Sequence, residues 1–242
     1  MIYLIISKFN ESIYNKYISD TINHLRLGNF VGVRKDDYRV INVEEGSSIY
    51  EKYNRGIEIS NIENEINNDD IYLFAHEDII IKDSYFFEKC KALFKSHPKL
   101  GILGIAGTRL ISEAGGWWLN PGHTLGKWQQ EHPNGYSNII EHRNNFPFDS
   151  LISVDGCCLV IKGEVLKNIR FDEDTFSNSW HFYDVDICFQ AKEIGYNIGF
   201  IDSLVHHASE GPLNSDWYDA RSKFLNKWKS KGYAFPITTN NF

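Results

Sequence analysis

Short apolar segments rich in β-branched and aromatic residues alternate along the chain with longer segments whose apolar residues recur at helical spacing. Short apolar runs are typical of buried strands, and the longer period is typical of amphipathic helices. The short segments predict strands at 2–6, 39–43, 71–75, 101–107, 154–161 and 197–201. The longer ones predict helices at 13–25, 49–59, 86–94, 184–194 and 217–228, with a helical turn at 164–166 and a frayed tail at 238–242. Strands and helices in alternation indicate an α/β fold.

Local signals mark the ends of several predicted helices. Ser48 and Glu51 have the spacing of a capping box, and Asp83 or Ser84 offers an N-cap for the following helix. Gly195 is suited to the C-terminal cap of the helix at 184–194. These signals separate each helix from the strand before or after it.

The segment 108–150 departs from this pattern, because Gly, Trp, Asn, His and Pro accumulate there without a period. We expect a long functional loop or a small excursion from the sheet. Exposed rings such as those of Trp117 and Trp118 suit stacking against a carbohydrate. The alternative is that these rings only pack the loop against the body of the domain.

Composition narrows the class of protein. A chain of 242 residues with 42% hydrophobic and 14% aromatic residues fits one large α/β domain. A net charge of −7 argues against a nucleic-acid polymer as the main partner, since binding phosphates along a polymer needs a basic surface. The cysteines lie inside apolar patterns and no secretory signal precedes the first strand, so we expect reduced thiols and a cytoplasmic protein. No apolar run approaches about 20 residues, so we expect any membrane contact to be peripheral.

Candidate chemistry first appears where the predicted strand at 71–75 ends. His76, Glu77 and Asp78 follow that strand directly. Ligands of open α/β sheets bind at the carboxyl ends of the strands, so an imidazole and two carboxylates there form a candidate site. The alternative is a polar turn that only caps the next helix.

A second group of candidate residues lies late in the chain. Asp184 and Asp186 stand at the start of a predicted helix, and His206 and His207 follow the predicted strand at 197–201. Two residues apart on a helix, the two carboxylates point in different directions, so we expect at most one to face a site. Because both groups follow strand-like runs, we expect Asp78 to lie near His206 or His207.

In order and spacing these segments resemble the GT-A glycosyltransferases, in particular the family 2-like group that transfers a sugar from a nucleotide diphosphate. The residues that carry the resemblance are Ser7, Asn10, Tyr53-Asn54-Arg55-Gly56, His76-Glu77-Asp78, Phe171-Asp172-Glu173, Tyr183-Asp184-Val185-Asp186, Gly195-Tyr196 and His206-His207. The resemblance implies a GT-A (Rossmann-like) fold with a mixed, mostly parallel central sheet flanked by helices. It also implies a single domain, 1–242, with a nucleotide-sugar-binding half at 1–107 and an acceptor-binding and catalytic half at 108–242.

The resemblance assigns roles to the candidate residues. His76-Glu77-Asp78 stands where the family has its Asp-x-Asp motif, with Asp78 as the matching metal ligand and His76 in place of the first Asp. The expected cofactor is Mn²⁺ or Mg²⁺, and an imidazole ligand favours Mn²⁺. His206 and His207 are further candidate ligands. Asp184 aligns with the catalytic base, which implies inversion at the anomeric carbon.

The expected partners are a nucleotide-diphospho-sugar donor and a carbohydrate or other hydroxyl-bearing acceptor. Candidate donor contacts are Ser7, Asn10, Glu44, Glu45, Asn54, His76, Glu77 and Asp78, with the two glutamates at the end of the second strand as nucleobase contacts. Candidate contacts to the acceptor or the donor sugar are Trp117, Trp118, Asp155, Gly156, Trp180 and Asp186.

Two other functions compete with this one. A metal-dependent hydrolase would use the candidate ligands with Asp184 activating water, but the chain lacks H-E-x-x-H and paired Cys-x-x-Cys ligands. A non-catalytic relative would bind a glycan or nucleotide without turnover. An assay for release of nucleoside diphosphate from a nucleotide sugar distinguishes the transferase, the hydrolase and the non-catalytic relative.

Overall fold

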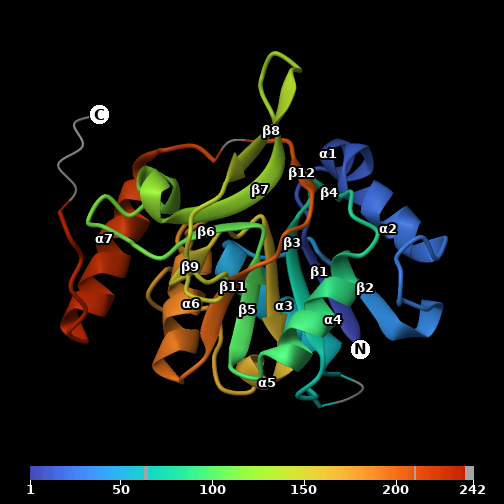
Figure 1. The fold of residues 1–242 in the computed structure, drawn as a ribbon, viewed down its shortest axis with the longest axis horizontal. Helices are drawn as coiled ribbons and strands as arrows, with labels where there is room; N and C mark the ends of the chain where they lie inside the picture. The colour runs from blue at the N-terminus through green and yellow to red at the C-terminus, as the bar shows by residue number, and fades with distance from the viewer. Residues whose placement is uncertain (63–64, 210, 238–242) are drawn as a thin grey trace.

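The protein is built on a mixed central sheet, seen in a computed structural model that describes residues 1–62, 65–209 and 211–237 (Figure 1). In these ranges the strand order is β11-β5-β10-β3-β1-β2. The strands are β1 (Ile2–Ser7), β2 (Tyr38–Val43), β3 (Ile71–His76), β5 (Leu100–Gly104), β10 (Cys158–Lys162) and β11 (Asn197–Phe200). Only β10 runs antiparallel to its neighbours, so the predicted α/β fold with a mostly parallel sheet is confirmed. The tail predicted at 238–242 lies outside the described residues.

The register of the parallel strands brings polar residues to one edge of the sheet. β1 pairs in register with β2 on one side and β3 on the other, and Ser7 stands opposite both Val43 and His76. Because the three strands run in the same direction, their carboxyl ends meet at this edge. The loops that follow these strands therefore converge on one place.

Helices cover both faces of the central sheet. They are α1 (Glu11–Lys16), α2 (Ile18–Arg26), α3 (Ile49–Ser60), α4 (Phe86–Ser96), α5 (Gly163–Leu166), α6 (Tyr183–Glu193) and α7 (Ser215–Ser230), with 3₁₀ turns η1 (Lys35–Asp37), η2 (Trp117–Leu119) and η3 (Pro121–His123). Alternate residues of β1 pack on opposite faces, since side chains of a strand alternate. Tyr3 and Ile5 join the core with α3, α6 and α7, whereas Leu4 and Ile6 pack with α2 and α4.

Several predicted element ends differ in detail. The helix predicted at 13–25 divides at Tyr17 into α1 and α2. Ser48 caps α3 by accepting the Glu51 N–H, but the Glu51 carboxylate accepts from Ser47, so the capping box is shifted by one residue. Asp83 accepts the Tyr85 N–H just before α4. Gly195, at φ +90°, comes one residue later than predicted for the cap, because α6 ends at Glu193 and Ile194 is its C-cap.

A second sheet covers the carboxyl edge of the first. Its order is β4-β12-β7-β6-β9, with β8 paired to β7. The strands are β4 (Ile79–Ile81), β6 (Ala106–Thr108), β7 (Thr124–Glu131), β8 (Ser137–His142), β9 (Ser153–Val154) and β12 (Val205–His207). The strands predicted at 101–107 and 154–161 each divide between the two sheets.

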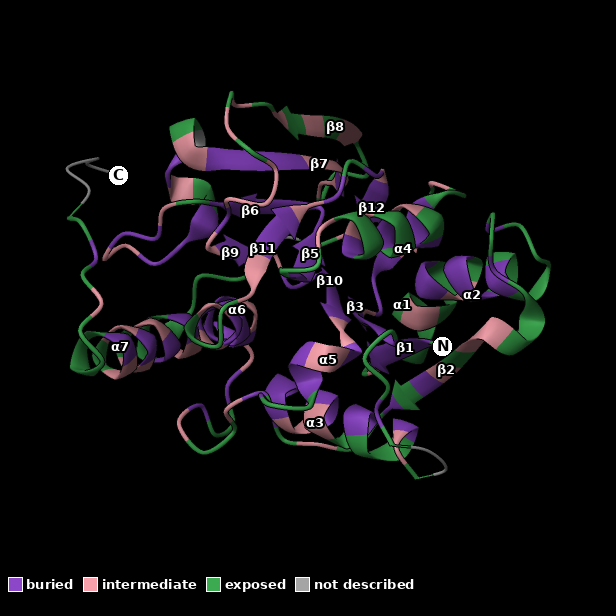
Figure 2. Ribbon diagram, turned by 60° about the horizontal axis from the view of Figure 1, so that its bottom comes forward, coloured by how far each residue is buried: buried purple, intermediate pink, exposed green. Residues whose placement is uncertain are grey.

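The segment 108–150 is the small excursion from the sheet, one of the two expected forms, and its middle is a β7–β8 hairpin that projects from the body in Figure 1. In β8 no residue is buried, and Figure 2 shows it in the intermediate and exposed colours. The hairpin is held by backbone pairing between the two strands. The hydrophobic pattern of the sequence does not reveal a strand of this kind, because the side chains of the strand supply little of the buried surface.

A buried ion cluster joins α6 to α7. The fully buried Asp186 accepts hydrogen bonds from Lys227 Nζ (2.7 Å), Trp228 Nε1 (2.8 Å) and Gln190 Nε2 (2.8 Å). Lys227 Nζ also pairs with Asp172 at 2.7 Å. Because three donors saturate one carboxylate, the first turn of α6 is fixed to the last turns of α7.

We expect Lys227→Met to lower the free energy of unfolding by about 3 kcal/mol, since removing one partner leaves the Asp186 charge buried without its counter-ion. Urea denaturation measures the loss. Lys223→Met is the matched control, because it removes an exposed pair with Asp219 (2.9 Å) from the same helix and should cost less than about 1 kcal/mol. Equal losses in both variants would contradict a stabilising role for the cluster.

Candidate active site

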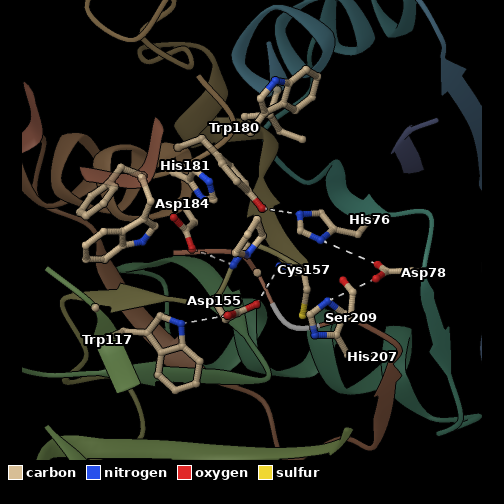
Figure 3. Close-up of a pocket in the computed structure, with 18 of the residues that line it drawn as sticks. His76, Asp78, Trp117, Asp155, Cys157, Trp180, His181, Asp184, His207 and Ser209 are labelled. Atoms are coloured by element: carbon tan, nitrogen blue, oxygen red, sulfur yellow. Dashed lines mark hydrogen bonds and ion pairs between the residues drawn. The ribbon is translucent and has the colours of Figure 1, made fainter. Parts of the chain in front are cut away.

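A cavity of about 820 Å³ lies where the second sheet meets the carboxyl edge of the first. Its walls come from the loop after β1, the β3–β4 turn, η2, the segment between β9 and β10, the end of β12 and the start of α6. Figure 3 shows the side chains that line it. This is the place where the polar ends of the parallel strands converge.

Two imidazoles and a carboxylate meet in this cavity. His76 ends β3, Asp78 follows it, and the pairing of β12 with β4 sets His207 opposite Ile79. His76 Nδ1 lies 3.9 Å from Asp78 Oδ1, and His207 Nε2 lies 3.7 Å from Asp78 Oδ2 (Figure 3). One ligand atom from each of the three lies within 4.8 Å of the others. We call His76, Asp78 and His207 the His-Asp-His triad.

The triad fits a divalent cation. Asp78 Oδ1 and His207 Nε2 are buried and have no hydrogen-bond partner among the described residues. Buried polar atoms normally have a partner, and a bound cation would supply one. Burial alone would raise the pKa of Asp78, but His207, His76 and the Ser209 hydroxyl hold it below its ordinary value. Desolvation lowers the pKa of His76, which favours the neutral imidazole that metals bind. Two imidazoles with one carboxylate suit Mn²⁺ better than Mg²⁺.

His206 lies on the other side of β12 and does not join the triad. Its Nε2 is 3.2 Å from Glu131 Oε2, and its ring packs edge-on against Tyr17. Adjacent residues of a strand point to opposite faces, so only one of the paired histidines can face the cavity. The structure therefore brings together His76, Asp78 and His207 from the four candidate ligands.

Asp184 faces the same cavity from the first turn of α6. Its Oδ1 accepts the Val185 N–H and its Oδ2 accepts the Gly156 N–H, both at 2.9 Å. Desolvation by the surrounding protein, followed by the charge of Asp155, raises the pKa of Asp184 to about 7. In Figure 3 Asp184 and Asp155 lie together, on the opposite side of the view from Asp78.

Asp155 and Gly156 shape the site around Asp184. Asp155 accepts hydrogen bonds from Trp117 Nε1 and from the Cys157 N–H, both at 2.9 Å. A Cβ atom at Gly156 would lie 2.2 Å from the Tyr183 hydroxyl, so a side chain there would collide with that ring. Asp155 lines the cavity, and Gly156 gives Tyr183 the space it occupies.

The structure divides the predicted donor contacts into two groups. Ser7 and Glu77 line the cavity, but Glu77 is occupied, because its carboxylate accepts the N–H of Phe9 (2.7 Å) and of Asn10 (3.0 Å). Glu77 thus fixes the loop after β1. The Asn10 side chain caps α1.

The remaining donor candidates lie outside the cavity lining. Glu44 pairs with Lys8 at 2.9 Å and Glu45 pairs with Arg55 at 2.7 Å. Asn54 exchanges two hydrogen bonds with the backbone of Phe171, so its amide joins α3 to the segment before α6. Asp186, predicted to hold substrate, is instead buried in the cluster with Lys227 described above.

Aromatic side chains form one wall of the cavity. Trp117, Trp118 and Trp180 line it; Trp118 is 43% exposed, but Trp117, expected to be an exposed ring, is buried. Phe182 and Trp217, which were not predicted from the sequence, also line the cavity, and their rings are tilted at 52° with centroids 5.4 Å apart. Sequence analysis also missed His181 and Ser209. Their proximity to Asp184 and His207 in the sequence is the signal that could have indicated them.

Comparisons with known proteins identify the family and the fold. A family described as "Glycosyltransferase like family" matches residues 3–229. TarS of S. aureus (residues 1–349, in complex with UDP-GlcNAc) is 12% identical with a TM-score of 0.52, covering 87% of this chain and 59% of that one. GalNAc-T7 with UDP, GalNAc and Mn²⁺ is 10% identical with a TM-score of 0.52, covering 90% and 45%. The fold is GT-A.

A relative in Fuscovulum blasticum, named "ATP synthase subunits region ORF 6", is 24% identical over 160 residues, which are 65% of this chain and 59% of that protein. The chain thus spans about half to three fifths of the length of these proteins.

None of the helices in the described ranges combines the length and the apolar character that crossing a bilayer demands.

We expect His207→Gln to weaken Mn²⁺ binding by about tenfold or more. Removing a residue that only hydrogen-bonds a metal ligand already costs about tenfold in affinity, and removing the ligand itself should cost at least as much. Isothermal titration with Mn²⁺ alone measures the affinity. His206→Gln is the matched control on the adjacent position and should bind Mn²⁺ nearly as the wild type does. A weaker affinity in the His206 variant than in the His207 variant would show that the triad is not the metal site.

Proposed function

We propose that this chain, which belongs to the glycosyltransferase-like family, transfers a sugar from a nucleotide-diphosphate donor to an acceptor hydroxyl with the help of a divalent cation and with inversion at the anomeric carbon. The observation that supports this best is the presence of the His-Asp-His triad and a carboxylate of raised pKa in one cavity. Sugar transfer needs a cation that neutralises the leaving diphosphate and a base that deprotonates the acceptor hydroxyl.

The donor diphosphate is proposed to lie against the triad. His76, Asp78 and His207 would hold Mn²⁺ or Mg²⁺, which when bound neutralises charge on the leaving phosphates. The nucleoside would then extend along the edge formed by residues 1–107. Ser7 supports this placement, because its buried hydroxyl lines the cavity and has no hydrogen-bond partner among the described residues.

Asp184 is proposed as the general base. A carboxylate whose pKa is about 7 is largely ionised just above neutral pH and still basic enough to accept a proton. It takes the proton of the acceptor hydroxyl while the acceptor oxygen bonds to the anomeric carbon. The bond from that carbon to the phosphate oxygen breaks, and its electron pair leaves with the nucleoside diphosphate. Attack from the face opposite the leaving group inverts the configuration.

The acceptor is proposed to be a carbohydrate that stacks on the aromatic wall. Trp118, Phe182 and Trp217 present apolar ring surface next to Asp184, and aromatic faces suit the apolar face of a sugar ring. Asp216 and His181 lie beside them, 3.8 Å apart, and supply polar groups for hydroxyls. Other hydroxyl-bearing acceptors of similar shape would use the same wall.

A panel of nucleotide sugars, incubated with Mn²⁺ or with EDTA, tests the activity. We expect nucleoside diphosphate to be released from at least one donor with Mn²⁺, and chelation to suppress the release. Tight donor binding with no release, with or without sugar acceptors, would instead indicate a non-catalytic module. Release that EDTA does not reduce would contradict the role of the metal.

We expect Asp184→Asn to lower kcat by about 10²- to 10⁴-fold while donor affinity stays nearly unchanged, because a general base acts on the acceptor in the transition state. Donor hydrolysis serves as the assay until an acceptor is found, and calorimetry measures donor affinity. Asp219→Asn neutralises a carboxylate on α7 that lies outside the cavity lining and should cost far less. A fully active Asp184→Asn variant would assign the base to another residue, with Asp155 the next candidate.

The acid limb of the pH profile should report the same group. Because the pKa of Asp184 is raised to about 7, kcat/KM should rise with pH through about 7 and level off above it, where the carboxylate is ionised. Asp155→Asn removes a charge that contributes to this rise, so its acid limb should move to lower pH. A limb near the ordinary pKa of an aspartate in the wild type, or an unmoved limb in the variant, would contradict this electrostatic account.

A further inference from the structure

We propose that Tyr183 is a positioning residue that orients His76 as a metal ligand and ties the metal site to the helical turn that carries Asp184. This role rests on the proposed function, since it acts through the triad. Tyr183 is adjacent to Asp184 in the chain and reaches the opposite side of the cavity, so one turn of α6 would serve both groups.

The evidence begins with one hydrogen bond. The Tyr183 hydroxyl lies 2.6 Å from His76 Nε2. The other ring nitrogen, Nδ1, is the one that faces Asp78 Oδ1 at 3.9 Å. If Nε2 carries the proton and donates it to the tyrosine oxygen, the Nδ1 lone pair is left for the cation. Outer partners of metal-bound histidines fix the tautomer and the ring orientation in this way.

Tyr183 is held rigidly enough to perform this task. Only 5% of it is exposed, and its ring packs against Tyr50, Tyr53 and Phe171. An immobile hydroxyl gives His76 a fixed acceptor.

Gly156 links this contact to the proposed base. The glycine has no side chain to displace the Tyr183 hydroxyl, which would lie 2.2 Å from a Cβ atom there. The same residue donates its N–H to Asp184 Oδ2. The turn that begins α6 is itself special, because Phe182 has a left-handed backbone (φ +65°), which is rare for a bulky residue and tends to occur at functional sites. Both side chains are thus aimed by the same local geometry.

The competing explanation is that Tyr183 only fills the core, and a neighbouring tyrosine provides the control. Tyr53 is fully buried in the same aromatic cluster, with its ring 5.6 Å from that of Tyr183. Its hydroxyl has no hydrogen-bond partner among the described residues. Removing the Tyr53 hydroxyl therefore repeats the change in packing without touching His76.

The experiment compares Tyr183→Phe with Tyr53→Phe in the full chain. Isothermal titration with Mn²⁺, without nucleotide, measures affinity, and ¹⁵N NMR of the metal-free protein measures the tautomer of His76. We expect Tyr183→Phe to bind Mn²⁺ about 10- to 100-fold more weakly and to lose the preference for the Nε2–H tautomer. Tyr53→Phe should match the wild type in both measurements.

The outcomes separate this inference from the function on which it rests. Wild-type affinity and an unchanged His76 tautomer in Tyr183→Phe would overturn the positioning role alone. Equal weakening in both phenylalanine variants would also overturn it, because packing would then explain the loss. Absence of Mn²⁺ binding by the wild type would overturn the metal site as well, whereas donor release that persists in EDTA would still support transfer without it.

Discussion

The site depends on how three of the carboxylates in one cavity are accommodated. Asp78, Asp155 and Asp184 all line it, and a carboxylate enclosed by protein is costly unless it is paired, hydrogen-bonded or protonated. The burial of each carboxylate is compensated in a different way. Asp78 faces two imidazoles, Asp155 accepts from an indole and a backbone N–H, and Asp184 takes up a proton near pH 7. These different environments are what allow three similar side chains to have different roles.

The fold supplies these environments by joining two sheets. Parallel pairing aligns the end of β1 with the end of β3, which fixes where His76 and Asp78 stand. The second sheet then carries β12 across this edge and brings His207 to Asp78, although the two are far apart in the chain. α6 closes the other side and is fixed by the Asp186 cluster beneath it. The chemistry is thus assembled from elements that are each held by their own packing.

The sequence predicted the central sheet well, because its inner strands are buried on both faces and most of its helices are amphipathic. It did not predict the second sheet. β4, β9 and β12 are only two or three residues long, and β8 is held by backbone pairing rather than by apolar burial.

The same limit applies to the site. Placement at strand ends indicated His76 and Asp78, but His206 and His207 can be told apart only when the face of β12 that meets the cavity is known. Trp217 lies in a helical stripe typical of core, and nothing in that spacing shows that it also lines the cavity.

The histidine at position 76 changes the charge of the metal site. The resembled family has an aspartate there, so this ligand set has one carboxylate fewer. Desolvation keeps His76 neutral, and Asp78 is then the only anionic ligand of the triad. A divalent ion held by one carboxylate and two neutral imidazoles would keep a net positive charge, which would attract the diphosphate of the proposed donor. Magnesium prefers all-oxygen ligands, so the same exchange would favour manganese at the proposed metal site. The loss of a carboxylate therefore fits a change of ion preference better than a loss of metal binding.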